Sequence, residues 1–113
     1  MTQLVKTAMI SQPMNGLTEQ EIRNARHELV QALYDAGFRV VDTVFAEYET
    51  EELATNERKG VYCLGKGLMS MATVDVVVFM PGWEKARGCR LEHDICEAYG
   101  IPYVDSDELD KLR

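Results

Sequence analysis

Residues 74–80 of the chain read VDVVVFM, and after a short loop residues 88–92 read GCRLE. An apolar run rich in Val is typical of a buried strand, and the apolar spacing that follows predicts a helix over residues 88–99. Glu92 then lies in the first turn of that helix, where the helix dipole favours an ionised carboxylate. Glutamate is also a common first-turn residue in ordinary helices. The segment alone therefore leaves a structural and a ligand-binding interpretation open.

The rest of the chain repeats the alternation of strands and helices. Strands are predicted at residues 6–10, 38–42, 74–80 and 101–104, and helices at 22–36, 61–71 and 88–99. Thr18 and Glu21 have the spacing of a capping box at the start of the first helix. This order predicts one α/β domain over residues 1–113, with a doubly wound, flavodoxin-like parallel sheet of four to five strands. The expected strand order is 2-1-3-4, with helices on both faces.

Composition restricts the possible functions. The 113 residues carry a net charge of −7, which argues against a broad nucleic-acid interface but allows a small anionic ligand. We expect a cytoplasmic protein, because the chain has neither an apolar signal region nor a run long enough to span a membrane. Three cysteines without a C-x-x-C pair indicate neither a disulfide framework nor a zinc site. We also find no group of His, Cys or carboxylate residues with ligand spacing, so we expect no metal or cofactor.

A binding site is predicted where the loops after the first and third strands diverge at the sheet edge. The candidate substrate-binding residues of the first loop are Ser11, Gln12, Pro13, Met14, Asn15 and Gly16. Those of the second loop and the following helix start are Gly82, Trp83, Arg87 and Gly88. Gly16 tolerates positive φ, Trp83 offers a stacking face, and Arg87 suits a phosphate or carboxylate. The alternatives are an ordinary connection, a core cap for Trp83 and solvated surface charge for Arg87.

Other residues receive structural interpretations. Asp75 lies at the entry of the third strand, so it is expected at the edge of the sheet opposite the site. His93 is expected to pack or to lie at the surface, since it projects away from Glu92 by about 100° on a helix. The acidic segment 44–59 is either a solvated connector or a lid over the site. Residues 105–113 are expected to form a polar tail with one or two helical turns.

Three segments together resemble the nucleoside 2-deoxyribosyltransferase-like superfamily. They are MISQPMNG at residues 9–16, ATVDVVVF at 72–79 and the stretch from Gly82 to Glu92. The resemblance is closest to a small, uncharacterised bacterial and phage branch, a DUF4406-like domain of unknown function. Enzymes of the superfamily cleave or exchange the N-glycosidic bond of deoxynucleosides or their 5′-monophosphates. Their nucleophilic Glu lies four residues after a glycine, and Glu92 matches that position from Gly88.

The resemblance implies a small-molecule nucleoside or nucleotide ligand, no nucleic acid or membrane partner, no cofactor, and a homodimer or higher homo-oligomer whose neighbouring subunit completes the pocket. Active members often have Tyr where this chain has Met9, and Asp or Ser where it has Ala86. Gln12 replaces a usual glycine. Two functions follow: an N-glycosidase or deoxyribosyltransferase with Glu92 as nucleophile, or a non-catalytic nucleotide-binding or sensing protein in which Glu92 anchors a ribose hydroxyl.

Overall fold

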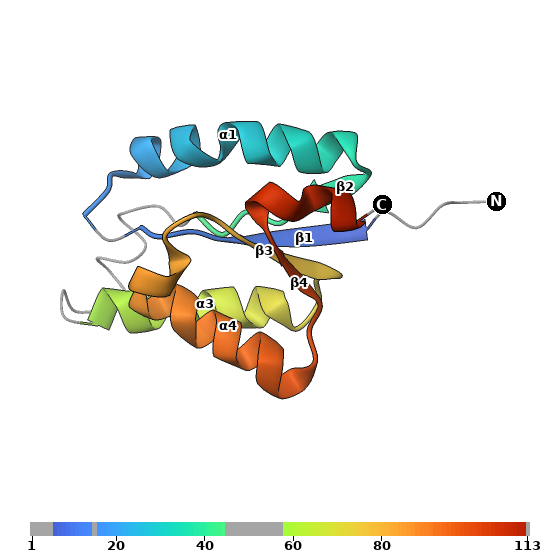
Figure 1. Cartoon of the computed structure of the whole chain (residues 1–113). Helices are drawn as coiled ribbons and strands as arrows, with labels where there is room; N and C mark the ends of the chain where they lie inside the picture. Colours follow the sequence, from blue (N-terminus) through green and yellow to red (C-terminus); the bar gives the residue numbers. More distant parts are fainter. Residues whose placement is uncertain (1–5, 15, 45–57, 113) are drawn as a thin grey trace.

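The computed structural model describes residues 6–14, 16–44 and 58–112 (Figure 1). In chain order its elements are β1 (Lys6–Ser11), α1 (Glu19–Asp35), β2 (Phe38–Val40), α3 (Lys59–Met71), β3 (Val76–Phe79), the 3-10 helix η2 (Trp83–Lys85), α4 (Arg87–Tyr99), β4 (Tyr103–Asp105) and the 3-10 segment η3 (Ser106–Leu112). The predicted connector or lid at 44–59 lies outside the described residues except at its two ends.

The four strands form one parallel sheet in the order β2-β1-β3-β4. The α/β fold and the strand order are therefore as predicted. Three predicted strands are longer than the observed ones because their ends belong to turns. The amide of Val74 donates to the carbonyl of Ser70 at the end of α3, and that of Ile101 donates to the carbonyl of Cys96 at the end of α4. The predicted strand at 38–42 ends at Val40, although the next amide still donates to Ala8.

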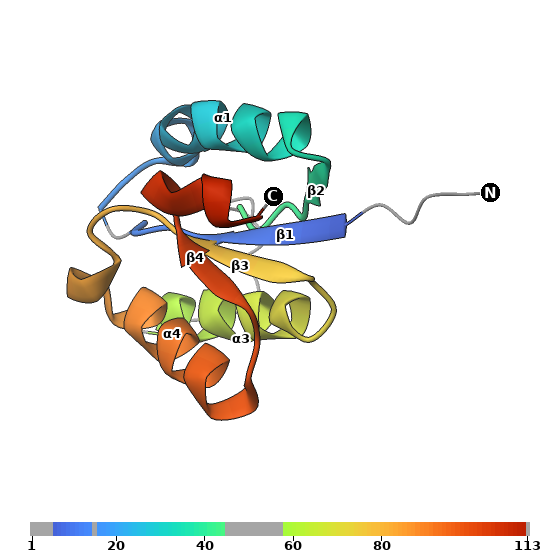
Figure 2. The same cartoon turned by 45° about the vertical axis from the view of Figure 1, so that its right-hand side comes forward.

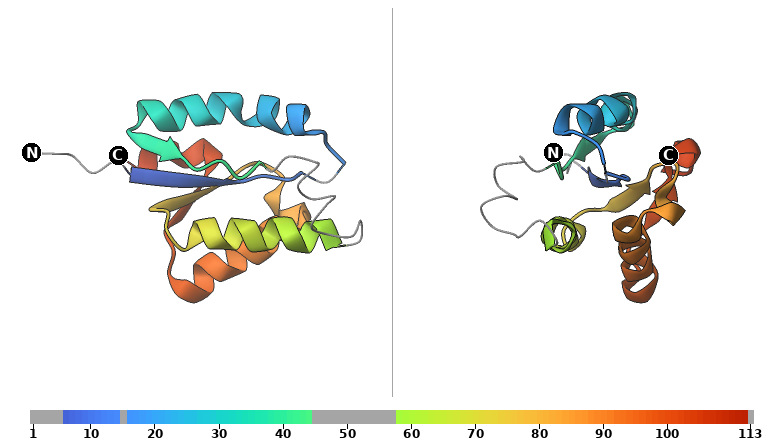
Figure 3. Two further views of the ribbon diagram at one scale, coloured as in Figure 1. Left: turned by 180° about the vertical axis from the view of Figure 1, so that it is seen from behind. Right: turned by 90° about the vertical axis from the view of Figure 1, so that its left-hand side faces the viewer.

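Helices cover the sheet on both faces (Figure 2). Helix α1 and η3 lie on one face, and α3 and α4 lie side by side on the other (Figure 3). Alternate strand residues supply two cores, because successive side chains of a strand point to opposite faces. The core under α1 contains Ala8, Ile10, Leu33, Phe38, Val76 and Val78. The core over α3 and α4 contains Met9, Met71, Val77, Phe79 and Cys96.

The chain after β4 packs more closely than a polar tail would. Leu109 and Leu112 of η3 are partly buried against the core under α1. At the opposite edge from the predicted site, Asp75 accepts hydrogen bonds from the backbone amide and the hydroxyl of Thr7. Its predicted structural role is confirmed. Among the described helices, none is long and apolar enough to cross a membrane.

The start of α1 differs from the starts of α3 and α4. The capping box is present: the Thr18 hydroxyl accepts from the amide of Glu21, whose carboxylate accepts from the amide of Thr18. Neither α3 nor α4 has a side-chain cap or an acidic residue in its first turn. Within their own caps and first turns, these two helices therefore lack the compensation of the partial positive charge that α1 has.

Candidate functional site

Glu92 lies on the buried face of α4, next to the carboxyl end of β1. The helix begins at Arg87, so Glu92 lies beyond its first turn and the predicted first-turn position is wrong. The hydroxyl of Ser11, the last residue of β1, donates to Oε1 of Glu92 over 2.6 Å. Ser11 and Met9 lie two residues apart and point to the same face of the sheet, toward α3 and α4. Glu92 is 8 % exposed and Ser11 is 1 % exposed. The contact therefore fixes the direction of a carboxylate that is almost completely removed from solvent.

Among the described residues, burial and the Ser11 hydroxyl dominate the electrostatic surroundings of Glu92. Burial raises the pKa of Glu92 above its ordinary value of 4.5, while the hydrogen bond from Ser11 opposes that rise. Cys89 and Cys96 lie on the same buried face of α4, at positions i−3 and i+4 from Glu92. Burial raises the pKa of both thiols, that of Cys96 to about 11, and the nearby Glu92 charge acts in the same direction. Both thiols are therefore neutral neighbours of the carboxylate at physiological pH.

Gly67 of α3 faces the other carboxylate oxygen. A Cβ placed on Gly67 would lie 2.6 Å from Oε2 of Glu92 and 3.3 Å from Cε of Met9. Such a contact is far inside the van der Waals distance, so only glycine permits the observed position of the carboxylate. From the sequence alone, a glycine at this position only predicts a less stable helix. Glycines inside helices often mark a close approach of this kind.

The predicted residues of the first loop are divided between two faces of the sheet. Gln12 is buried on the α1 side, where its amide donates to the carbonyl of Ile22 and accepts from Nε of Arg26 over 2.8 Å. It therefore supports the loop, and its contact with a ligand stays a prediction. Pro13 and Met14 are half-buried and Gly16 is exposed with a φ of 81°, whereas Asn15 lies outside the described residues.

Arg26 is a buried cation that the sequence analysis did not identify. It is 5 % exposed, and burial lowers its pKa to about 10. Besides Gln12, its guanidinium reaches the hydroxyl of Thr43 with two longer hydrogen bonds. Within the described ranges no carboxylate forms an ion pair with it. The sequence of α1 does not show which of its Arg residues is buried, because an Arg in an amphipathic helix is usually exposed.

The second loop places its aromatic residue against the core. Trp83 stacks on His93 with ring centroids 4.3 Å apart and packs at an angle on Phe79. The core-cap interpretation of Trp83 and the packing role of His93 are therefore both observed. Gly82 has a φ of 89°, and a Cβ there would lie 3.7 Å from Cγ of Pro13, so the two predicted loops come into contact.

Arg87 and Gly88 begin α4 and are both exposed. A Cβ on Gly60, in the first turn of α3, would lie 3.7 Å from a terminal nitrogen of Arg87. The guanidinium therefore lies beside the start of α3 as well as at the start of its own helix. An exposed position fits both interpretations of Arg87, so its contact with an anionic ligand stays a prediction.

Two hollows border Trp83. One of about 330 Å³ lies along the outer side of α4 and is lined by Trp83, Glu84, Arg87, Arg90, Leu91, His93 and Asp94. One of about 260 Å³ lies between the ends of β3 and β4. Neither hollow is lined by Glu92 or Ser11. The open space beside Trp83 and the buried carboxylate are therefore separate features.

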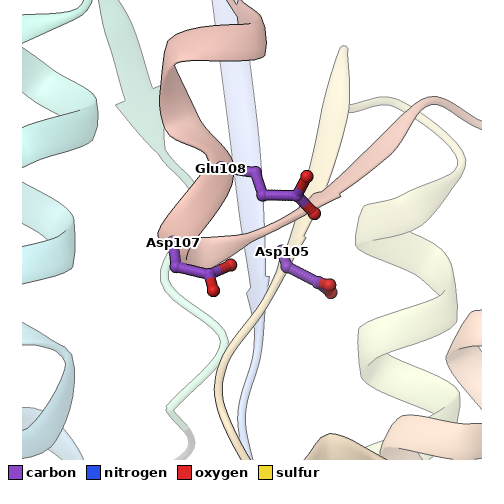
Figure 4. Close-up of side chains that lie close together, drawn as sticks. All are labelled: Asp105, Asp107 and Glu108. Atoms are coloured by element: carbon purple, nitrogen blue, oxygen red, sulfur yellow. The ribbon is translucent and has the colours of Figure 1, made fainter.

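Three acidic side chains gather where β4 ends and η3 begins (Figure 4). One carboxylate oxygen from each of Asp105, Asp107 and Glu108 lies within 4.8 Å of the others. The expectation that no carboxylates gather in a possible ligand group is corrected by this cluster. Glu108 is already paired with Lys111. Exposed acidic groups are common without an ion, so we assign no metal to this cluster.

The fold and the site define a class of protein: a doubly wound α/β domain with a buried carboxylate at the carboxyl edge of its sheet. A family model described as "Domain of unknown function (DUF4406)" matches residues 6–105, and the chain belongs to this family. A comparison with curated proteins gives no match. The matched residues include all four strands, Ser11, Gly67 and Glu92. Because the family description names no activity, the function has to be argued from the site.

Proposed function

We propose that the protein cleaves or transfers the N-glycosidic bond of a nucleoside or nucleotide, with Glu92 as the nucleophile. The observation that supports this most directly is the buried carboxylate of Glu92, which the Ser11 hydroxyl holds over 2.6 Å at the carboxyl edge of the sheet. A carboxylate that is fixed in direction and removed from bulk water is suited to attack on an electrophilic carbon. The resemblance to the nucleoside 2-deoxyribosyltransferase-like superfamily supplies the substrate class.

The proposed reaction has two steps. One carboxylate oxygen of Glu92 forms a bond to the anomeric carbon while the bond from that carbon to the base nitrogen breaks, and the base departs with a proton from solvent. Water then adds its hydroxyl to the anomeric carbon and releases Glu92, or a second base takes the sugar instead. The negative charge of Glu92 also stabilises the positive charge that develops on the sugar. No cofactor is needed for either step.

Ser11 performs the orienting role in this proposal. Active members of the superfamily often use a Tyr in the first strand, at the position of Met9. In this chain the donor comes from two residues further along the same strand face. A hydroxyl that donates to the carboxylate favours its ionised form, which is the form that attacks. Although this chain has Met9 in place of the usual Tyr, Glu92 therefore still has an orienting partner, Ser11.

The charge around the site favours a phosphorylated substrate. The uncapped starts of α3 and α4 carry partial positive charge, and Arg87 lies beside both. Helix starts with free backbone amides bind phosphate readily. We therefore place a nucleoside 5′-monophosphate ahead of an unphosphorylated nucleoside as the substrate.

A non-catalytic nucleotide-binding role is the second candidate. The residue that precedes α4 favours it over catalysis. Ala86 caps α4 without a side-chain hydrogen bond, at the position where active members have Asp or Ser. In this role Glu92 would accept a hydrogen bond from a ribose hydroxyl and no bond would break.

The partner that we propose for the chain is a second copy of itself. The resemblance implies that a neighbouring subunit completes the pocket. On α3, the helix next to Glu92, Val61 and Met69 are 68 % and 71 % exposed. Light scattering of the purified protein measures the oligomeric state directly, and a monomer at all concentrations would contradict this part of the proposal.

Incubation with a panel of ribo- and deoxyribonucleosides and their 5′-monophosphates tests the proposed function, with free base measured by chromatography. Glu92→Gln is compared with wild type, and Glu28→Gln serves as the control because Glu28 is exposed on α1. The proposal expects base release by wild type and the control but not by Glu92→Gln. If no protein releases base, even with an acceptor base present, the enzymatic proposal fails for that panel. Ligand-dependent thermal shifts then identify a binding protein.

A further inference from the structure

Helix α3 contains three glycines in different surroundings. A Cβ on Gly65 would meet nothing within 4 Å, and one on Gly60 would make an ordinary contact with Arg87 at 3.7 Å. A Cβ on Gly67 would lie 2.6 Å from Oε2 of Glu92. The three positions therefore separate the general effect of glycine in a helix from a specific effect on the carboxylate.

Glycine inside a helix lowers its stability relative to alanine, because the unfolded chain loses more backbone freedom. Open space at Gly65 gives no packing reason for a glycine. Gly67 has such a reason, since it is buried and borders both Glu92 and Met9. The carboxylate of Glu92, on the neighbouring helix α4, occupies the space that a side chain at position 67 would need.

We propose that Gly67 is a positioning residue for Glu92, because it leaves the space in which Oε2 lies while Oε1 accepts the hydrogen bond from Ser11. The carboxylate is thus fixed from two sides, by a donor on β1 and by a backbone surface on α3. Any side chain at position 67 pushes Glu92 away from Ser11. The inference rests on the proposed function only where it treats Glu92 as the nucleophile, and the contact itself is independent of any activity.

The first test is a stability cycle that needs no substrate. Gly67→Ala, Gly65→Ala, Glu92→Ala and the double variant Gly67→Ala/Glu92→Ala are compared by thermal denaturation. Gly65→Ala should raise the melting temperature. Gly67→Ala should lower it by several degrees in wild type, yet raise it in the Glu92→Ala background, because the space left by the carboxylate accepts the methyl group.

The outcomes of this cycle are distinct. If Gly67→Ala does not fold but the double variant does, the clash with Glu92 is confirmed. The inference is wrong if Gly67→Ala behaves like Gly65→Ala in wild type. It is also wrong if Gly67→Ala destabilises wild type and the Glu92→Ala background equally, or if neither Gly67→Ala nor the double variant folds. The next nearest side chain in the described part of the chain is Met9, and its flexible end can move by the few tenths of an ångström required.

The second test reports on position rather than stability. The titration of the Glu92 side-chain carboxyl is followed by carbon-13 NMR, its signal assigned by its absence from Glu92→Gln. Among the described residues, the thiols of Cys89 and Cys96 respond to the charge of Glu92, and Ser11 of β1 and Gly67 of α3 contact its carboxylate. Gly67→Ala should raise the pKa of Glu92, because the carboxylate loses the Ser11 donor and gains an apolar neighbour. An unchanged or lowered pKa would overturn the positioning role.

The pH profile of base release gives the corresponding functional readout. If wild type is active, Gly67→Ala should lose activity at low pH first, whereas Gly65→Ala should keep the wild-type profile. If wild type releases no base while the stability cycle and the titration succeed, the proposed reaction fails and the positioning of Glu92 stands. The two proposals can therefore fail separately.

Discussion

Replacing Ser11 with alanine removes the one hydrogen bond that the described residues give to Oε1 of Glu92. The donor is 1 % exposed and the acceptor 8 % exposed, so water replaces it poorly. A hydrogen bond to a charged group contributes about 1.5–3 kcal/mol, and we expect Ser11→Ala to lower the free energy of unfolding by that amount at neutral pH. For a domain of this size the melting temperature falls by about 4 °C per kcal/mol.

The effect should depend on pH with a defined sign. Burial raises the pKa of Glu92 above 4.5, so the folded protein holds this proton more tightly than the unfolded chain. Glu92 therefore favours folding below its unfolded pKa, and this contribution is lost as the pH rises through the folded pKa. Without the Ser11 donor the pKa rises further, so the variant should be most destabilised at neutral pH and least in acid.

Ser70→Ala is the matched control for this measurement. Ser70 is half-buried, whereas Ser11 is fully buried, and the Ser70 hydroxyl donates to a backbone carbonyl one turn earlier in α3, over 3.4 Å. Alanine is the better helix former there, so the stability should remain equal or rise slightly. Urea denaturation of both variants across pH provides the comparison. Equal stability of Ser11→Ala and wild type at neutral pH would refute the argument that this hydrogen bond holds the carboxylate.

Three further predictions follow from the same structure. Glu92→Gln should raise the melting temperature at neutral pH, since it removes a desolvated charge, and the gain should disappear below pH 4.5; a loss at neutral pH would contradict this. Gln12→Ala should lower the free energy of unfolding in urea by about 1–3 kcal/mol, because it leaves the buried guanidinium of Arg26 without its shortest hydrogen bond. An unchanged free energy of unfolding would show that Gln12 does not support the loop. Thr18→Ala should lower the free energy of unfolding by about 1 kcal/mol and speed amide hydrogen exchange in the first turn of α1. Unchanged exchange there would argue against the capping box.

The sequence predicted the fold because its signals are local. Alternating apolar strands and helical spacing, with a capping box at the start of α1, define the order of elements. The rules of parallel connections then give the sheet order 2-1-3-4. The strand ends were less predictable, since Val74 and Ile101 are apolar yet their amides complete the ends of helices. Apolar composition alone does not distinguish a strand residue from a buried turn residue.

The sequence also determined that Glu92 follows a buried strand and belongs to the helix after it, at the carboxyl edge of the sheet. Only the tertiary structure decided what surrounds it. Ser11 lies 81 residues away in the chain, and Gly67 comes from a third element. Such contacts depend on how each helix is rotated and how far it is shifted along the sheet, which no local pattern encodes. The same reason explains why Gln12 points to Arg26 on the opposite face of the sheet and why Trp83 packs on His93.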